Sequence, residues 1–155
     1  MVIQDNGFDD PSKWAVSGAY SGGAAIQNSR GEMRISTGPY RINESSRGTI
    51  SQVVNMPSDY FINFHYEMHD ATDFPGYRCR VLVDGATVWE RYIPRNGYAS
   101  GNPTIDLSLY TGIHTLSFQM DMTYAFYAYW SATSYFYIDN IVDSCPDLKA
   151  NMTIL

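Results

Sequence analysis

Apolar and polar side chains alternate along most of this chain with a period of two residues. In residues 62–69, INFHYEMH, the apolar side chains fall on one side of the alternation and His65, Glu67 and His69 fall on the other. This period is typical of a β-strand that buries one face. It recurs at 32–36, 49–56, 60–69, 77–83, 87–93, 104–110, 114–122 and 135–142. No stretch shows the i, i+3, i+4, i+7 spacing of an amphipathic helix, so the pattern predicts an all-β protein.

Turn-forming residues separate these stretches. Asp84 and Gly85 lie between two apolar runs and predict a tight β-hairpin. Prolines occupy other gaps, where a missing N–H breaks no strand pairing: Pro57, Pro75, Pro94 and Pro103. About ten short strands at this spacing predict a two-sheet antiparallel β-sandwich with jelly-roll topology. We expect one domain over residues 1–145, and a linker or the start of a following domain over residues 146–155.

The charge balance excludes some classes of partner. The chain carries 16 acidic and ten basic residues, a net charge of −6, and the basic residues are scattered rather than gathered in a run. A nucleic-acid partner is therefore not expected. No apolar run reaches the 18 or so residues of a membrane-spanning helix. Abundant Tyr, scarce Lys and many small polar residues are typical of secreted β domains, so we expect a module of a larger extracellular or cell-surface protein.

Five segments occur in an order that resembles a known superfamily. They are NGFDDPSKWAVSG (6–18), ISQVVNMPSDYFINFHYEMHD (50–70), YRCRVLVDGATVWE (77–90), TIDLSLYTGIHTLSFQM (104–120) and YFYIDNIV (135–142). The order resembles that of galactose-binding-like β-jelly-roll modules, which include carbohydrate-binding modules and accessory domains of secreted hydrolases and proteases. The resemblance implies a non-catalytic module that binds a polysaccharide or another glycan.

The same resemblance implies a structural calcium ion that joins the first part of the chain to the last strand. Its ligands would be the carboxylates of Asp9 and Asp139 and the carbonyls around Ser21 to Gly23. Carboxylate and carbonyl oxygens are the ligands that calcium prefers. Without the resemblance, GFDDPSKW is simply a turn with solvated acidic residues, and that interpretation stays open.

A second candidate site follows from the hairpin. If Asp84-Gly85 is a two-residue turn, Arg80 pairs with Trp89. Six side chains then share one surface as a sugar-binding platform: Trp89, Arg80, Arg78, Arg91, Glu67 and His65. Two alternatives remain open, namely a cation–π pair of Trp89 with Arg80 that binds no ligand, and a longer turn that shifts the pairing.

Two interpretations are open for the polar side of this strand, which carries His65, Glu67 and His69. Two imidazoles and a carboxylate at i, i+2 and i+4 on one strand face are a plausible set of zinc ligands. An exposed face alternates polar residues in any case, and Arg78 and Arg80 would then be charge partners for Glu67.

The segment from Tyr124 to Trp130 is unusually aromatic for a connection between strands. Tyr127, Tyr129 and Trp130 lie where a loop is normally polar. They would either bind a glycan or a protein partner, or cover an open end of the sandwich.

No motif for a catalytic nucleophile, a phosphate loop or a metalloprotease helix is present. The sequence therefore favours a binding module over an enzyme. Two alternatives remain, namely an adhesion or structural module that contacts protein, and a jelly-roll lyase or metal-dependent enzyme. Cys79 and Cys145 would form one disulfide or remain two buried thiols.

Overall fold

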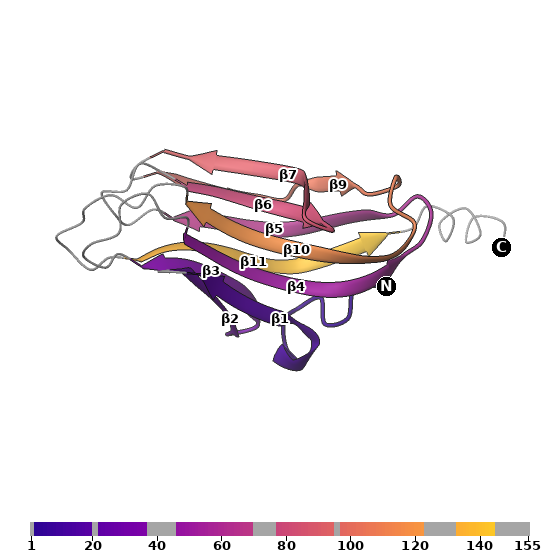
Figure 1. Cartoon of the computed structure of the whole chain (residues 1–155), viewed down its shortest axis with the longest axis horizontal. Helices are drawn as coiled ribbons and strands as arrows, with labels where there is room; N and C mark the ends of the chain where they lie inside the picture. The colour runs from indigo at the N-terminus through magenta and orange to yellow at the C-terminus, as the bar shows by residue number, and fades with distance from the viewer. Residues whose placement is uncertain are drawn as a thin grey trace.

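The described part of the chain consists mainly of β-strands. The computed structural model describes residues 2–19, 22–36, 46–69, 77–94, 97–122 and 133–144. Over these ranges the strands run along the long axis of the molecule, after one short 3-10 turn, η1 (Figure 1). The elements are η1 (Pro11–Lys13), β1 (Ala15–Ala19), β2 (Gly22–Gln27), β3 (Arg30–Ser36), β4 (Ser46–Met56), β5 (Phe61–His69), β6 (Tyr77–Val83), β7 (Ala86–Ile93), β8 (Tyr98–Gly101), β9 (Thr104–Asp106), β10 (Gly112–Met122) and β11 (Thr133–Ser144).

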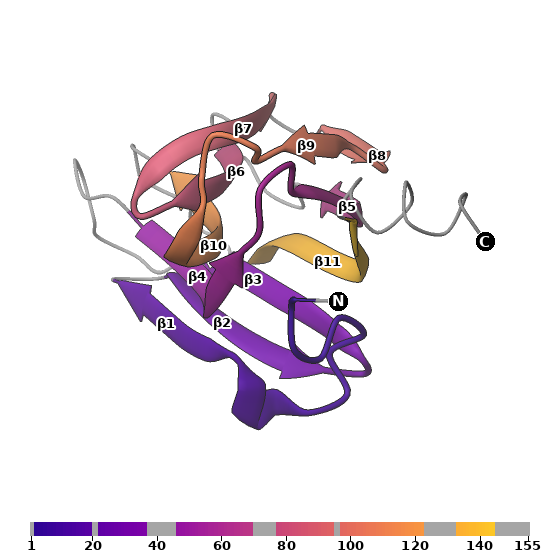
Figure 2. The same cartoon turned by 90° about the vertical axis from the view of Figure 1, so that its right-hand side faces the viewer.

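These strands form two antiparallel sheets packed face to face. Sheet A has the strand order β1-β4-β10-β6-β7, and sheet B has the order β2-β3-β11-β5-β8, with β9 paired to β5. Figure 2 looks along the strands and shows the two sheets as separate layers. The predicted two-sheet jelly-roll sandwich is confirmed. Within the described ranges, no helix is long and apolar enough to cross a membrane.

The core lies between the sheets and follows the alternation in the sequence. In β5 the even-numbered residues from Ile62 to Met68 are buried, whereas the odd-numbered ones are partly exposed. Strands β4 and β10 bury alternate residues in the same way, and Phe118 of β10 packs edge-on against Phe64 of β5. The apolar stripes of both sheets thus meet in one hydrophobic layer.

The two sheets are not evenly spaced. At the β1/β2 edge they almost touch, and at the β7/β8 edge they lie apart (Figure 2). Glycine permits the close approach, because a Cβ on Gly22 would collide with the backbone of Arg47, and one on Gly48 would collide with the carbonyl of Gly23. Large aromatic side chains fill the wider side of this wedge.

The first residues of the chain are bound to its last described strand. The backbone amides of Val2 and Ile3 both donate to Oδ2 of Asp143, and the Tyr60 hydroxyl donates to the same oxygen at 2.9 Å. Burial and the neighbouring carboxylate raise the pKa of Tyr60 above its usual range, so this hydroxyl remains a donor. Asn6 and Ile141 exchange hydrogen bonds nearby.

Cys79 is a fully buried free thiol in the core of β6. It lies two residues after Tyr77, whose hydroxyl donates to the carbonyl of Tyr135 near the start of β11. Ser144 lies at the other end of β11, and Cys145 is outside the described residues. The described residues thus agree with the free-thiol alternative for Cys79, and burial raises its pKa.

Candidate functional site

The predicted platform around Trp89 does not form, because the β6–β7 hairpin contains a bulge. The turn itself is as predicted, with Asp84 and Gly85 in the left-handed region and Val83 opposite Ala86. The register then shifts, so that Trp89 lies opposite Val81, and Arg80 lies opposite Glu90. One extra residue in β7 moves every later side chain to the other face.

Trp89 consequently packs, partly buried, against the core. Its ring packs edge-on against Phe64 at a centroid distance of 5.5 Å and against Tyr66 at 5.1 Å. Arg80 points the opposite way, out of sheet A, where it contacts Asp121. Both the predicted Arg80–Trp89 platform and the alternative cation–π pair are therefore wrong.

The other predicted platform residues lie on opposite sides of the sandwich. Arg78 and Arg80 are on the outer face of sheet A, whereas His65 and Glu67 are on the outer face of sheet B. The structure does not bring these two pairs together, so the predicted charge pairing of Glu67 with the arginines is also wrong. Arg91 lies opposite Cys79, on the side of β7 away from Arg80.

The outer face of sheet B carries a group of aromatic and polar side chains from four neighbouring strands. Phe136 and Ile138 of β11 are fully buried, so Tyr135 and Tyr137 point outward, as the alternation predicts. We call this surface the tyrosine face. It consists of Arg30, Glu32 and Arg34 of β3, Tyr135, Tyr137 and Asp139 of β11, His65, Glu67 and His69 of β5, and Tyr98 and Ser100 of β8.

The register arranges the tyrosine face in rows across the strands. Tyr137 lies between Glu32 of β3 and Glu67 of β5. In the next row, Tyr135 lies between Arg34 and His69. His69 in turn lies opposite Tyr98 of β8, and their rings make an edge contact at 6.5 Å. An aromatic row thus crosses three strands beside a row that contains two carboxylates.

Planar groups stack along β11. The rings of Tyr135 and Tyr137 are almost parallel, with 5.3 Å between centroids and 8° between planes. The guanidinium carbon of Arg30 lies 3.8 Å from the centroid of Tyr137, which is a cation–π contact. Burial raises the pKa of Tyr137, and the negative charge of Glu32 adds to this effect, so its hydroxyl stays protonated over the physiological range.

Polar groups around these rings are held in place by hydrogen bonds. Glu32 is only 4% exposed, and its Oε2 accepts a hydrogen bond from Nε2 of Gln27. His65 lies between two acceptors, with Glu67 Oε1 at 3.4 Å from Nε2 and Asn102 Oδ1 at 3.2 Å from Nδ1. Fixed donors and acceptors beside rigid rings suit the recognition of hydroxyl groups.

The predicted calcium ligands have other partners in the structure. Asp9 is exposed, and its Oδ1 accepts a hydrogen bond from the Ser29 hydroxyl at 2.7 Å. Asp139 lies opposite His65, and its Oδ1 accepts the amide of Asn140. Gly23 is in β2, and Ser21 is outside the described residues. In the part of the chain that the structure describes, no three His, Cys, Asp or Glu side chains gather as a metal site, so His65, Glu67 and His69 form no zinc site, and the calcium site stays a prediction.

Solved structures with the same architecture include carbohydrate-binding modules. TmCBM61, solved in complex with β-1,4-galactotriose, matches with a TM-score of 0.55 and 16% identity, over 93% of this chain and 98% of that one. A β-sandwich carbohydrate-binding module of promiscuous specificity matches with a TM-score of 0.52 and 8% identity, over 89% and 60%. This chain has the fold of those modules.

The fold is shared with an adhesin as well. The K1 cleaved adhesin domain of Lys-gingipain from Porphyromonas gingivalis W83 matches with a TM-score of 0.56 and 13% identity, over 90% of this chain and 95% of that one. No family model matches the sequence, and no curated protein matches it either. The resemblance read from the sequence is therefore confirmed as a likeness of fold.

Parts of the tyrosine face were readable in the sequence, and others were not. The period of two in 135–142 and 62–69 places Tyr135, Tyr137, His65 and Glu67 outward. Nothing in the sequence shows that β3 lies beside β11, so Glu32 and its neighbours on β3 are missed. The predicted aromatic residues Tyr127, Tyr129 and Trp130 are outside the described residues, and their role stays a prediction.

Proposed function

We propose that this chain is a non-catalytic carbohydrate-binding module and that a glycan binds on the tyrosine face. The observation that carries the proposal is the parallel pair Tyr135 and Tyr137, with Glu32 and Glu67 on the two neighbouring strands. Aromatic side chains offer apolar surface to the C–H groups of a sugar ring, and the half-exposed carboxylate of Glu67 accepts hydrogen bonds from its hydroxyls, whereas Glu32 is buried beneath the face. The shared fold of sugar-binding modules supports the same conclusion.

Such a module acts by tethering. Binding to a polysaccharide raises the local concentration of whatever domain is joined to the module, without any chemistry of its own. This role implies an extracellular or cell-surface location, which the composition also favours. The tyrosine face needs no metal for this purpose, because its donors and acceptors come from side chains.

A glycan array followed by calorimetry tests the proposal. Tyr135→Ala removes one ring, and Glu67→Gln removes one charge from a half-exposed side chain with little effect on folding. We expect each change to weaken binding about tenfold or more. Tyr92→Ala is the matched control, because Tyr92 is 52% exposed on the outer face of sheet A. Binding that survives both changes would refute the assignment of the site.

The same experiment distinguishes a glycan-binding module from the main alternative, an adhesion module. If no glycan on the array binds, and the isolated domain instead associates with itself or with a surface protein, an adhesion module is the better description. The observation that supports this alternative is the fold that the chain shares with the gingipain adhesin domain.

A further inference from the structure

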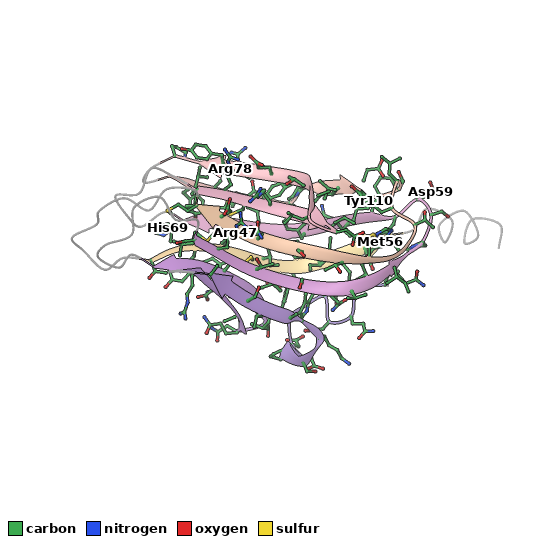
Figure 3. The ribbon with its side chains drawn as sticks, in the orientation of Figure 1. Arg47, Met56, Asp59, His69, Arg78 and Tyr110 are labelled. Carbon is green, nitrogen blue, oxygen red and sulfur yellow. The ribbon has the colours of Figure 1, made fainter. Side chains whose placement is uncertain are left out.

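The outer face of sheet A, on the opposite side from the tyrosine face, gathers arginine side chains. Asp121 of β10 lies opposite Arg47 of β4 on one side and opposite Arg78 of β6 on the other. Arg80 lies one row further along β6, opposite Gln119 and Glu90. Figure 3 labels Arg47 and Arg78 in the same half of the sandwich. We call this group the arginine face: Arg47, Arg78, Arg80, Glu90, Gln119 and Asp121.

One buried carboxylate holds two of the guanidinium groups. Asp121 is almost fully buried, and its Oδ1 accepts Nε of Arg47 at 2.9 Å, while its Oδ2 accepts Nη2 of Arg80 at 2.8 Å. Nη2 of Arg80 also donates to Oε1 of Gln119 at 3.1 Å. Because Arg47 bonds through Nε, the bond fixes the plane of its guanidinium group and leaves the two Nη groups at the end of the side chain.

The charges on this face do not cancel. The strand positions of the arginine face carry three arginines and two carboxylates, Asp121 and Glu90, which leaves a local charge of +1 in a chain whose net charge is −6. Arg47 is 49% exposed and Arg78 is 51% exposed, and the Arg78 contact with Glu90 is loose at 3.6 Å. The two exposed guanidinium groups flank Asp121 from strands on either side of β10, so both can meet one ligand.

We propose that the arginine face is a second binding site, for the anionic groups of an acidic polysaccharide. The planar fork of Arg matches a carboxylate or a sulfate group better than any neutral partner. Thr49 and Gln119 lie in the next row and add neutral hydrogen-bonding groups of the kind that bind sugar hydroxyls. The site lies on a different sheet from the tyrosine face, so it stands whether or not that face binds glycan.

Nucleic acid fits this face less well. Three arginines on a chain of net charge −6 would neutralise few phosphates, and Tyr92, the exposed ring opposite Arg78 in the described part of this face, is a single ring rather than a row on which successive bases could stack. A saccharide with one anionic group per residue or per disaccharide needs only the two exposed arginines. The ligand is therefore assigned as an acidic saccharide, with carboxylate and sulfate as its two possible sources of charge.

Calorimetric titration of the full chain with three probes tests the site. An oligogalacturonate supplies carboxylates, a sulfated oligosaccharide supplies sulfates, and a neutral galacto-oligosaccharide of equal length controls for the sugar alone. We expect at least one acidic probe to bind, with an affinity that falls as salt is raised. The double variant Arg47→Gln, Arg78→Gln should weaken that binding by roughly tenfold or more and leave binding of the neutral probe unchanged.

The matched control is Arg91→Gln. Arg91 is an exposed arginine of β7 on the side away from Arg80, so its removal changes the net charge equally without touching the arginine face. Thermal melts confirm that each variant folds. Three results would overturn the proposal: no binding of either acidic probe, an equal loss in Arg91→Gln, or a loss caused by Tyr135→Ala, which would move the acidic ligand to the tyrosine face.

Discussion

Replacement of Trp89 by Ala distinguishes a structural role for this residue from a ligand-binding one. The indole fills the wider side of the wedge and makes edge contacts with Phe64 and Tyr66. Trp→Ala in a core costs about 3–5 kcal/mol, and each aromatic contact contributes about 0.5–1.5 kcal/mol of that. Because Trp89 is only partly buried, we expect a loss of about 3 kcal/mol.

For a domain of 155 residues, such a loss lowers the melting temperature by about 10 °C. Differential scanning calorimetry measures this shift, and titration with any glycan found on the array measures binding below the melting range. Glycan affinity should stay within about a factor of two, because the indole is not on an outer face. Tyr92→Ala, three positions along the same strand and pointing outward, should leave the melting temperature nearly unchanged. An unaltered melting temperature together with lost glycan binding in Trp89→Ala would refute this account.

Two further predictions concern pH and calcium. Nδ1 of His114 lies 2.6 Å from Oδ2 of Asp84, and this contact raises the pKa of His114 above 6.5 and lowers the pKa of Asp84 below 3.8. The ion pair therefore stabilises the fold at pH values between the ordinary pKa of an Asp and that of a His. Its contribution is lost as the pH rises through the folded-state pKa of His114, or as the pH falls through the folded-state pKa of Asp84. Melts of wild type and His114→Gln should differ most near pH 5 to 6 and converge at alkaline pH; a constant difference would contradict the pairing. If Asp9 and Asp139 hold calcium, added calcium should raise the melting temperature and a chelator should lower it, whereas Asp9→Asn should abolish the response. Equal melts with calcium and with chelator would exclude a bound structural ion.

Alternation in the sequence predicted the fold well wherever strands bury one face. Segments 62–69 and 135–142 have a clear period of two, and their outward residues in the structure are the predicted ones. The alternation did not predict three of the strands, namely β1, β2 and β8. Their sequences, AVSGA, GGAAIQ and YASG, consist largely of small residues, so the two faces of each strand differ little in hydrophobicity. The burial of such strands depends on what packs against them.

The candidate site was less predictable for two physical reasons. A β-bulge near Val88 has no sequence signal comparable to Asp84-Gly85, yet it turns Trp89 from the outer face of sheet A to the side that faces the core. The order of strands in a sheet depends on long-range packing, which local sequence does not encode. The sequence therefore does not show that Glu32 lies beside Tyr137, nor that His65 and Arg80 lie on different sheets. Local pattern indicates which way a side chain points only where the strand has no bulge, and topology determines its neighbours.

The wedge has a consequence for the two outer faces. At the β1/β2 edge the spacing between sheets is set by backbone atoms in contact at Gly22 and Gly48, and it cannot shrink or adjust. At the β7/β8 edge it is set by the volume of side chains, Trp89 among them. We therefore expect a change of core volume on that side to tilt one sheet relative to the other, while the contacts at the glycine edge stay in place. The angle between the tyrosine face and the arginine face is thus adjustable through residues that belong to neither.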